Sequence, residues 1–328
     1  MDKITILEFA PCADSIHHLR RDREEGYVAS DGGNVTIRSG SRLRPRMVST
    51  YAGGKATNVA RVIEKLLRLE DRVEVELIVF RPDSPEGRYI HDLQTSALRR
   101  VQVRPVIIEG SARLCIDLSD PESGRDDRVE FNISPRAFWG AGALEIALER
   151  MSQLSTGLLL LAGNPPVMET TGEMAVDLYA RVMEIVRPHV SIISVDTEKG
   201  ALARCLAAQL PPDVIKINRD EYASVASPLW DGYTGTLLVT DAEGCTIREE
   251  GETRVQGAQV AKLYSTIGAG DAVHAGFTLA RWVWGFDAVR AARYGQAAAA
   301  ATVSAPDGTR GVTRQVVERW FAELERGE

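Results

Sequence analysis

The chain has 328 residues and a formal net charge of −7 at pH 7, with 44% hydrophobic and 26% charged residues. This composition is ordinary for a globular protein with a substantial core. Because there is no basic stripe to neutralise phosphates, we expect no nucleic-acid partner. Since no apolar run reaches transmembrane length, we expect no membrane span.

The predicted elements alternate between apolar strand runs and amphipathic helical stretches. Strands are predicted at Ile4–Phe9, Val73–Phe80, Val101–Ile108, Leu158–Ala162, Val190–Val195, Val214–Ile217 and Thr236–Thr240. Helices are predicted at Ala141–Leu154, Glu173–Val186 and Glu198–Ala208, and Ala269–Leu324 is mostly helical. This alternation predicts an α/β fold, a doubly wound and mostly parallel sheet flanked by helices, as a single domain over residues 1–328.

The first strand follows the N-terminus directly, so we expect no signal peptide. The four cysteines, Cys12, Cys115, Cys205 and Cys245, are scattered without a Cys-x-x-Cys spacing. They are typical of reduced, mostly structural thiols, which indicates a cytoplasmic protein.

Two strand-rich insertions interrupt the pattern, at about 15–52 and 111–132. A small isolated sheet is marginal in water and needs a packing partner. We therefore predict a homodimer joined through these strands.

A first glycine motif lies at Gly53-Gly54-Lys55, followed by Asn58. The glycines end a strand-like run, and a helix is predicted from Asn58 onward. Lys55 is expected on the loop and Asn58 in the first helical turn, where a cation and an amide suit a polyhydroxylated ligand. The alternative for Lys55 alone is a solvated lysine in a turn. The spacing is not that of a Walker A phosphate loop, because Ala56 follows the lysine.

A second glycine motif, Gly268-Ala269-Gly270-Asp271, precedes a helical pattern. Small residues let backbone N–H groups crowd together at a helix start, where the helix dipole favours an anion. A carboxylate in that first turn can accept the proton of a hydroxyl that attacks a phosphoryl group. One alternative is a tight loop in which the helix dipole alone favours Asp271. A dinucleotide site fits poorly, since Val273 occupies the required third glycine position.

Polar residues also end several predicted strands. Asp14, Asp196, Asn218 and Thr240 are expected, with Asp271, at the carboxyl edge of the sheet. Doubly wound sheets bind ligands at that edge. The convergence of five polar residues there favours a binding site over a set of ordinary turns.

The two glycine motifs, in this order and at this separation, resemble those of the PfkB (ribokinase-like) family of carbohydrate kinases. The resemblance runs from about Ile4 to Gly311. Within the family, the chain most resembles the branch containing 1-phosphofructokinase and tagatose-6-phosphate kinase. It implies ATP-dependent phosphotransfer to a hydroxyl of a sugar or sugar phosphate, with ATP and Mg²⁺. It also implies that the two insertions form a β-sheet lid over the sugar.

The resemblance further implies individual roles. Asp271 would be the general base, and backbone N–H groups of the Gly268–Asp271 segment, at Ala269, Gly270 and Asp271, would stabilise the transferred phosphoryl group. The residues implied to bind the sugar are Asp14, Gly53, Gly54, Lys55 and Asn58, with Arg113 holding a phosphate. Those implied on the nucleotide side are Asp196, Lys216, Asn218, Thr240 and Gly244. Asn218 and Glu221, in an Asn-x-x-Glu motif, would position Mg²⁺ through water.

The chain departs from the family pattern at a few points. Ala10 replaces an asparagine, and Ala162–Pro166 is shorter than the Ser-Gly-Ser segment of the phosphofructokinase branch. Ser265 stands where ribokinase carries an aspartate at its monovalent-cation site, which leaves a K⁺ requirement open. The alternatives are a ribokinase or nucleoside kinase, and a non-catalytic sugar- or nucleotide-binding protein on the same fold. An intact Asp271 argues against the last.

Overall fold

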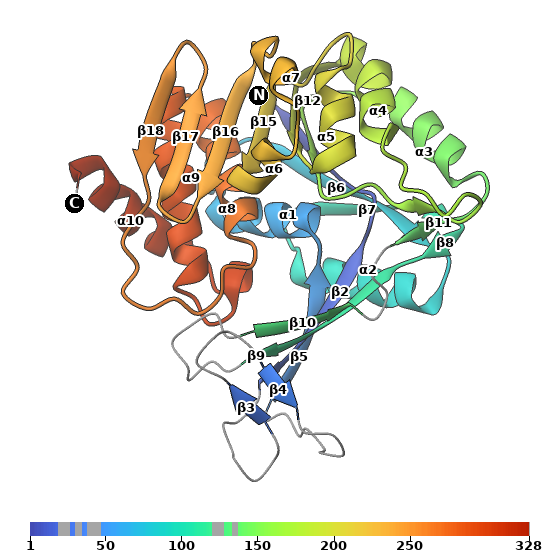
Figure 1. Ribbon diagram of the computed structural model, residues 1–328, viewed down its shortest axis with the longest axis horizontal. Helices are drawn as coiled ribbons and strands as arrows, with labels where there is room; N and C mark the ends of the chain where they lie inside the picture. The colour runs from blue at the N-terminus through green and yellow to red at the C-terminus, as the bar shows by residue number, and fades with distance from the viewer. Residues whose placement is uncertain (19–26, 30–34, 38–46, 120–127, 133–136, 328) are drawn as a thin grey trace.

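A computed structural model describes residues 1–18, 27–29, 35–37, 47–119, 128–132 and 137–327 (Figure 1). Its main feature is a nine-stranded sheet in the order β18-β17-β16-β15-β14-β12-β1-β6-β7. The strands are β1 (Lys3–Glu8), β6 (Glu74–Pro82), β7 (Gln102–Ile108), β12 (Thr156–Ala162), β14 (Val190–Asp196), β15 (Val214–Asn218), β16 (Thr236–Asp241), β17 (Gly244–Arg248) and β18 (Glu252–Gln256). All pairs are parallel except β16–β17 and β17–β18. The predicted doubly wound α/β fold is thus confirmed.

The central strands are apolar on both faces because helices cover both sides of the sheet. In β1, Ile4 and Ile6 point into one core, whereas Leu7 points into the other. The same alternation recurs in β12, where Leu158 and Leu159 belong to opposite cores. This burial on both faces explains the near-continuous apolar runs in the sequence.

Two groups of helices form the outer layers (Figure 1). The first core is covered by α1 (Lys55–Leu66), α8 (Ala269–Thr278), α9 (Ala288–Val303) and α10 (Arg314–Arg326). The second core is covered by α3 (Ala143–Ser152), α4 (Leu178–Val186) and α5 (Lys199–Leu206). The remaining helices are α2 (Pro85–Ala97), α6 (Arg219–Ala223) and α7 (Ser227–Asp231), with short helices at Arg187–His189, Leu279–Val283 and Gly308–Arg310.

A separate four-stranded sheet, in the order β10-β9-β2-β5, projects from one end of the body (Figure 1). It is made of β2 (Cys12–His18), β5 (Met47–Gly53), β9 (Arg113–Ser119) and β10 (Arg128–Asn132), and we call it the lid sheet. A hairpin of β3 (Tyr27–Ala29) and β4 (Val35–Ile37) lies beyond it, and β8 (Gly110–Ser111), β11 (Phe138–Trp139) and β13 (Val167–Met168) form a third small sheet. The predicted insertions at 15–52 and 111–132 lie partly outside the described residues.

The structure differs from the sequence-based prediction at several elements. The helix predicted from Glu173 begins only at Leu178, because the preceding residues pair with the chain around Val167: Met168 N–H donates to the Glu173 carbonyl at 2.8 Å. The strands β17 and β18 were not predicted. Lys55 is the first residue of α1 rather than part of the preceding loop.

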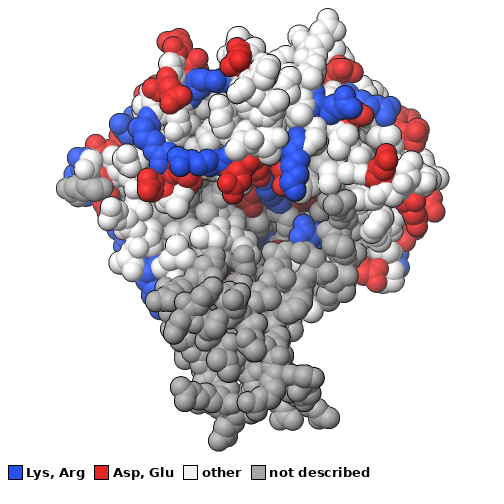
Figure 2. All heavy atoms as spheres, viewed as in Figure 1, with Lys and Arg blue, Asp and Glu red and all other residues white. Residues whose placement is uncertain are grey.

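Surface charge is mixed on the face of the body that Figure 2 shows. Lys and Arg side chains lie beside Asp and Glu side chains there. Among the described residues, none of the helices has the length and apolar character needed to span a membrane.

Candidate active site

Two adjoining cavities lie at the carboxyl edge of the large sheet, one of about 440 Å³ and the other of about 820 Å³. The first cavity is lined from the lid sheet, α1 and the start of α8. The second is lined from β16, the segment after β18, α8 and α9. Asn218, Thr240 and Gly270 line both, so the two cavities meet at these residues.

The start of α8 lies at this junction. Gly268 precedes the helix with a φ of 75°, a left-handed conformation that favours glycine, and a Cβ there would lie 2.5 Å from Thr309 Cγ2. The Ala269 N–H donates to the Thr266 carbonyl at 3.2 Å. The N–H groups of Gly270 and Asp271 belong to the first helical turn, which leaves them without a helical carbonyl partner. Of the three N–H groups predicted to stabilise a phosphoryl group, these two therefore remain as candidates.

Asp271 is buried and is held by a side chain from α1. Asn58 Nδ2 donates to Asp271 Oδ2 at 2.9 Å. The amide cannot reverse without losing contacts, because Asn58 Oδ1 accepts from Arg61 Nη1 at 2.7 Å and from Thr309 Oγ1 at 3.2 Å. The first glycine motif therefore positions the carboxylate of the second.

Burial raises the pKa of Asp271 to about 6, and the negative charge of Asp196 acts in the same direction. The charges of Lys55 and Lys216 and the hydrogen bond from Asn58 oppose this rise. The carboxylate is therefore ionised at neutral pH yet more basic than an exposed aspartate, which suits a general base.

Asp196 is fully buried at the end of β14 and binds two lysines. Lys216 Nζ lies 2.8 Å from Asp196 Oδ2, and Lys55 Nζ lies 2.7 Å from Asp196 Oδ1. Burial alone would raise the pKa of Asp196, but the two lysine charges hold it well below its usual range. Lys55 also lies 3.3 Å from Glu221 Oε1, so it is an ion-paired residue of the site rather than a solvated turn lysine.

Asn218 and Glu221 form a reciprocal cap at the start of α6. The Glu221 N–H donates to Asn218 Oδ1 at 2.8 Å, and the Asn218 N–H donates to Glu221 Oε2 at 2.7 Å. Both residues line the first cavity. A fixed carboxylate and amide beside the junction match the oxygen ligands, often reached through water, that Mg²⁺ prefers.

The lid sheet supplies part of the wall of the first cavity. Asp14 and Arg113 lie on neighbouring strands of this sheet and both line the cavity. Asp14 is thus within β2, not at the end of a strand of the large sheet as predicted. Its carboxylate lies over Gly53, where a Cβ would come within 1.8 Å of Asp14 Oδ2. Gly54, with a φ of 93°, leads the chain into α1 and lines the same cavity.

The second cavity has a different lining. Its walls include small and apolar side chains from the segment after β18 and from α8 and α9: Ala258, Val260, Leu263, Val273, Ala299, Ala300 and Val303. Thr240 lies at its border and donates its hydroxyl to the Ile217 carbonyl at 3.1 Å. Gly244 begins β17, where a Cβ would lie 2.2 Å from the Val255 carbonyl oxygen, so its role there is to let two strands approach.

A family model described as pfkB family carbohydrate kinase matches residues 32–314. The chain belongs to the PfkB family of carbohydrate kinases. This membership supports ATP-dependent phosphorylation of a sugar as the activity of the chain. No curated protein matches the chain.

Solved structures share the fold of this PfkB kinase. Phosphofructokinase-2 from Escherichia coli, in complex with substrates and products, has a TM-score of 0.79 at 20% identity, over 99% of this chain and 100% of that chain. A possible 1-phosphofructokinase from Thermotoga maritima has a TM-score of 0.75 at 15% identity, over 98% and 97%. The nucleoside kinase of Methanocaldococcus jannaschii has a TM-score of 0.63 at 18% identity, over 98% and 99%.

Sequence reasoning missed two buried titratable residues, one lining the first cavity and one behind it. Glu8, at the end of β1, accepts from the Thr57 N–H at 2.9 Å, lines the first cavity, and has its pKa raised to about 8 by burial. His274 lies 2.6 Å from Ser194 Oγ, and burial lowers its pKa to about 4. A carboxylate inside an apolar run, and a histidine three residues after Asp271, were the available signals.

Proposed function

We propose that this PfkB kinase transfers the γ-phosphoryl group of ATP to a hydroxyl of a ketose phosphate, with Asp271 as the general base. The observation that supports this most directly is the position of Asp271 and Gly270. Asp271 lines the first cavity, and Gly270 lies where the first and second cavities meet. Sugar would occupy the first cavity and ATP the second, so that the acceptor hydroxyl meets the γ-phosphoryl group at Gly270.

The carboxylate is prepared for one proton transfer. Asn58 holds Oδ2 of Asp271, which leaves Oδ1 to accept the proton of the attacking hydroxyl. The N–H groups of Gly270 and Asp271 then stabilise the charge that develops on the transferred group. Lys216, held by Asp196, lies beside Gly270 and adds a positive charge at the same place.

Asn218 and Glu221 would hold Mg²⁺ through water at the border of the cavities. When bound, the ion neutralises phosphate charge. The pairing of Glu221 with Lys55 keeps the glutamate aligned for this role.

Arg113 supports a phosphorylated sugar. Its strand lines the first cavity, and a guanidinium binds phosphate through a two-pronged hydrogen bond. Lys55 contributes less to this argument than the sequence suggested, because Asp196 and Glu221 already pair with it. A similar structure, E. coli phosphofructokinase-2 at 19% identity and a TM-score of 0.75, is a complex with fructose-6-phosphate.

The test is ATP consumption with a panel of acceptors in one assay. Fructose 6-phosphate, fructose 1-phosphate and tagatose 6-phosphate are compared with fructose, ribose and adenosine. We expect the highest kcat/KM with a ketose phosphate. Faster turnover of ribose or adenosine would contradict this choice and favour a ribokinase or nucleoside kinase. If the protein binds a sugar but consumes ATP with no acceptor of the panel, the result would favour a non-catalytic sensor.

We also propose a homodimer joined through the lid sheet. The four strands of this sheet extend from the body (Figure 1). Among the described residues, α2 packs on the sheet through a small cluster of Ala13, Ile90 and Ala112, and a second copy would cover more of it. E. coli phosphofructokinase-2, a structural relative at 19% identity, has a tetrameric inhibited form. Sedimentation from catalytic dilution to high concentration should give a dimer mass, and a monomer mass throughout would contradict the proposal.

A further inference from the structure

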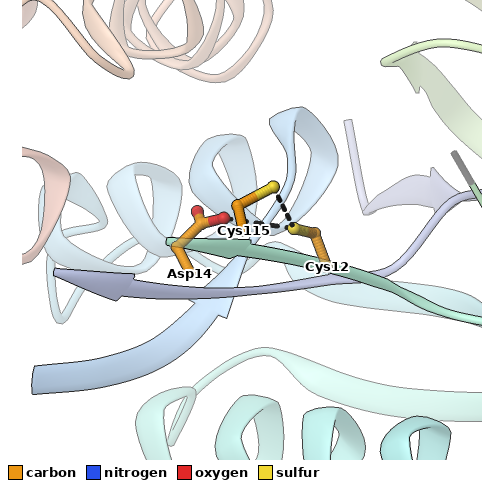
Figure 3. Close-up of side chains that lie close together, drawn as sticks. All are labelled: Cys12, Asp14 and Cys115. Atoms are coloured by element: carbon orange, nitrogen blue, oxygen red, sulfur yellow. Dashed lines mark hydrogen bonds between the residues drawn. The ribbon is translucent and has the colours of Figure 1, made fainter. Parts of the chain in front are cut away.

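Two thiols and a carboxylate lie together on the wall of the first cavity (Figure 3). Cys12 Sγ lies 3.5 Å from Cys115 Sγ and 3.1 Å from Asp14 Oδ1. The three ligand atoms all lie within 4.8 Å of one another. Cys12 and Asp14 come from β2, and Cys115 comes from the neighbouring strand β9.

The strand register argues against a disulfide between the two thiols. Cys12 is opposite Arg113, and Cys115 is opposite Asp14, so the cysteines are diagonal neighbours. In this parallel pair, a strand spacing of about 4.8 Å and a rise of about 3.3 Å per residue place Cα atoms of diagonal neighbours about 8 Å apart. A disulfide needs Cα atoms within about 7 Å, so the backbone of a well-paired sheet would have to move.

The same spacing suits two ligands of one metal ion. Tetrahedral Zn²⁺ with Zn–S bonds of about 2.3 Å places its sulfur ligands about 3.8 Å apart. The observed separation of 3.5 Å is within a few tenths of an ångström of this. Two sulfurs and one carboxylate oxygen make a donor set that favours a soft or borderline divalent ion over Mg²⁺.

We propose that Cys12, Asp14 and Cys115 form a binding site for a thiophilic divalent cation of the Zn²⁺ class. The three residues supply three ligands, and the first cavity supplies the open fourth position. Binding replaces the two thiol protons, which leave to solvent, and breaks the hydrogen bond from the Cys12 thiol to Asp14. The resulting site carries a net charge of −1, and Arg113, opposite Cys12, partly offsets it.

Occupancy of this site would exclude the sugar. Asp14 is the predicted ligand of the sugar hydroxyls, and it cannot hold a metal ion and a sugar at the same time. This part of the proposal rests on the proposed function, whereas metal binding itself does not. The lid sheet would then act as a metal-responsive inhibitory site of the kinase.

The test uses Co²⁺ alone as a spectroscopic probe with the full chain. We expect one equivalent of Co²⁺ to give a thiolate-to-cobalt charge-transfer band and to release two protons. Cys12→Ser and Cys115→Ser should each strongly weaken the band, because each removes one of its two thiolate ligands, while Cys205→Ser, a buried cysteine elsewhere, should keep it at full intensity. No band in the unsubstituted protein, or a band of undiminished intensity in Cys115→Ser, would overturn the proposal.

A second measurement needs no variant and so does not depend on whether the serine variants fold. Zn²⁺ should protect Cys12 and Cys115 of the unsubstituted protein from alkylation, as mapped by mass spectrometry. Equal alkylation with and without Zn²⁺ would count against the site.

A competition experiment separates this proposal from the proposed function. Fructose 6-phosphate at about ten times its Kd should weaken Co²⁺ binding about ten-fold. Co²⁺ binding in a protein that phosphorylates no sugar would support the metal site and reject the kinase assignment. Phosphorylation of a sugar without any Co²⁺ binding would support the kinase assignment and reject the metal site. Co²⁺ binding that a phosphorylated sugar leaves unchanged would overturn the inhibitory role.

Discussion

The first and second cavities meet at Gly270 but differ in the balance of their linings. The first carries most of the titratable groups, including Glu8, Asp14, Lys55, Glu221 and Asp271. The second has Asp241 and Glu243, but it also includes methyl groups of α8, α9 and the segment after β18. Under the proposed function, the first cavity carries the chemistry and the second recognises its ligand mainly by shape. Substitutions in the two cavities should therefore change different kinetic constants.

The sharpest test of this division is Asp271→Asn. We expect kcat to fall by about 10²–10⁴, the usual contribution of a general base, with ATP affinity almost unchanged. Asp220→Asn, in an exposed position of α6, is the matched control and should keep full activity. Near-normal turnover of the Asp271 variant would mean that another group accepts the proton.

A substitution at the border should affect both cavities. A Cβ on Gly270 would lie 2.6 Å from Lys216 Nζ and would push that amine out of its ion pair with Asp196. We expect Gly270→Ala to lower kcat/KM for sugar and for ATP by about 10²-fold. Gly232→Ala, where a Cβ meets no atom within 4 Å, should be neutral. A selective effect on one substrate would show that the cavities are independent.

Arg113→Ala probes the far wall of the first cavity. We expect KM for a ketose phosphate to rise about 30-fold, the scale of a charged hydrogen bond lost, with KM for ATP unchanged. The exposed Arg104→Ala serves as a control for loss of one positive charge. If the KM for the phosphosugar does not change, Arg113 is an ordinary residue of the lid sheet.

The acid limb of the pH profile should report Asp271. Because its pKa is raised to about 6 and the ionised form is the base, kcat/KM should halve near pH 6 and fall about ten-fold per unit below it. Substrate phosphates titrate in the same range, so the control is Asn58→Ala. Loss of its hydrogen bond to Asp271 should move the limb to higher pH, whereas a limb set by the substrate would stay in place.

The smallest effect is expected in the second cavity. Val303→Ala removes two methyl groups from its wall, so KM for ATP should rise only about three-fold while kcat stays the same. Initial rates at saturating ATP provide the check. A fall in kcat would show that this wall also aligns the reacting groups.

The large sheet could be predicted because its strands are buried on both faces and therefore apolar throughout. The strands β17 and β18 could not, since an edge strand such as β18 exposes Glu252 and Thr253 and resembles a loop in sequence. The late start of α4 also escaped, because its first predicted residues pair with the chain around Val167 instead. The local pattern of apolar residues cannot predict pairing between segments that are distant in the sequence.

The candidate site shows the same limit. Both glycine motifs were visible because each is a local pattern of backbone requirements. The partners of Lys55 were not, since Asp196 is 141 residues away in the sequence. Glu8 escaped for a similar reason: its partner Thr57 is on another element, 49 residues away.

The hydrogen bond between Asn58 and Asp271 joins groups 213 residues apart, and that between Arg61 and Thr309 spans 248. The reacting centre therefore cannot form on the ribosome until the last third of the chain has emerged and α8 has docked on α1. Contacts at such separations carry a loop-closure cost that makes folding slow. A partly folded state in which α8 has not docked on α1 therefore lacks the proposed catalytic centre.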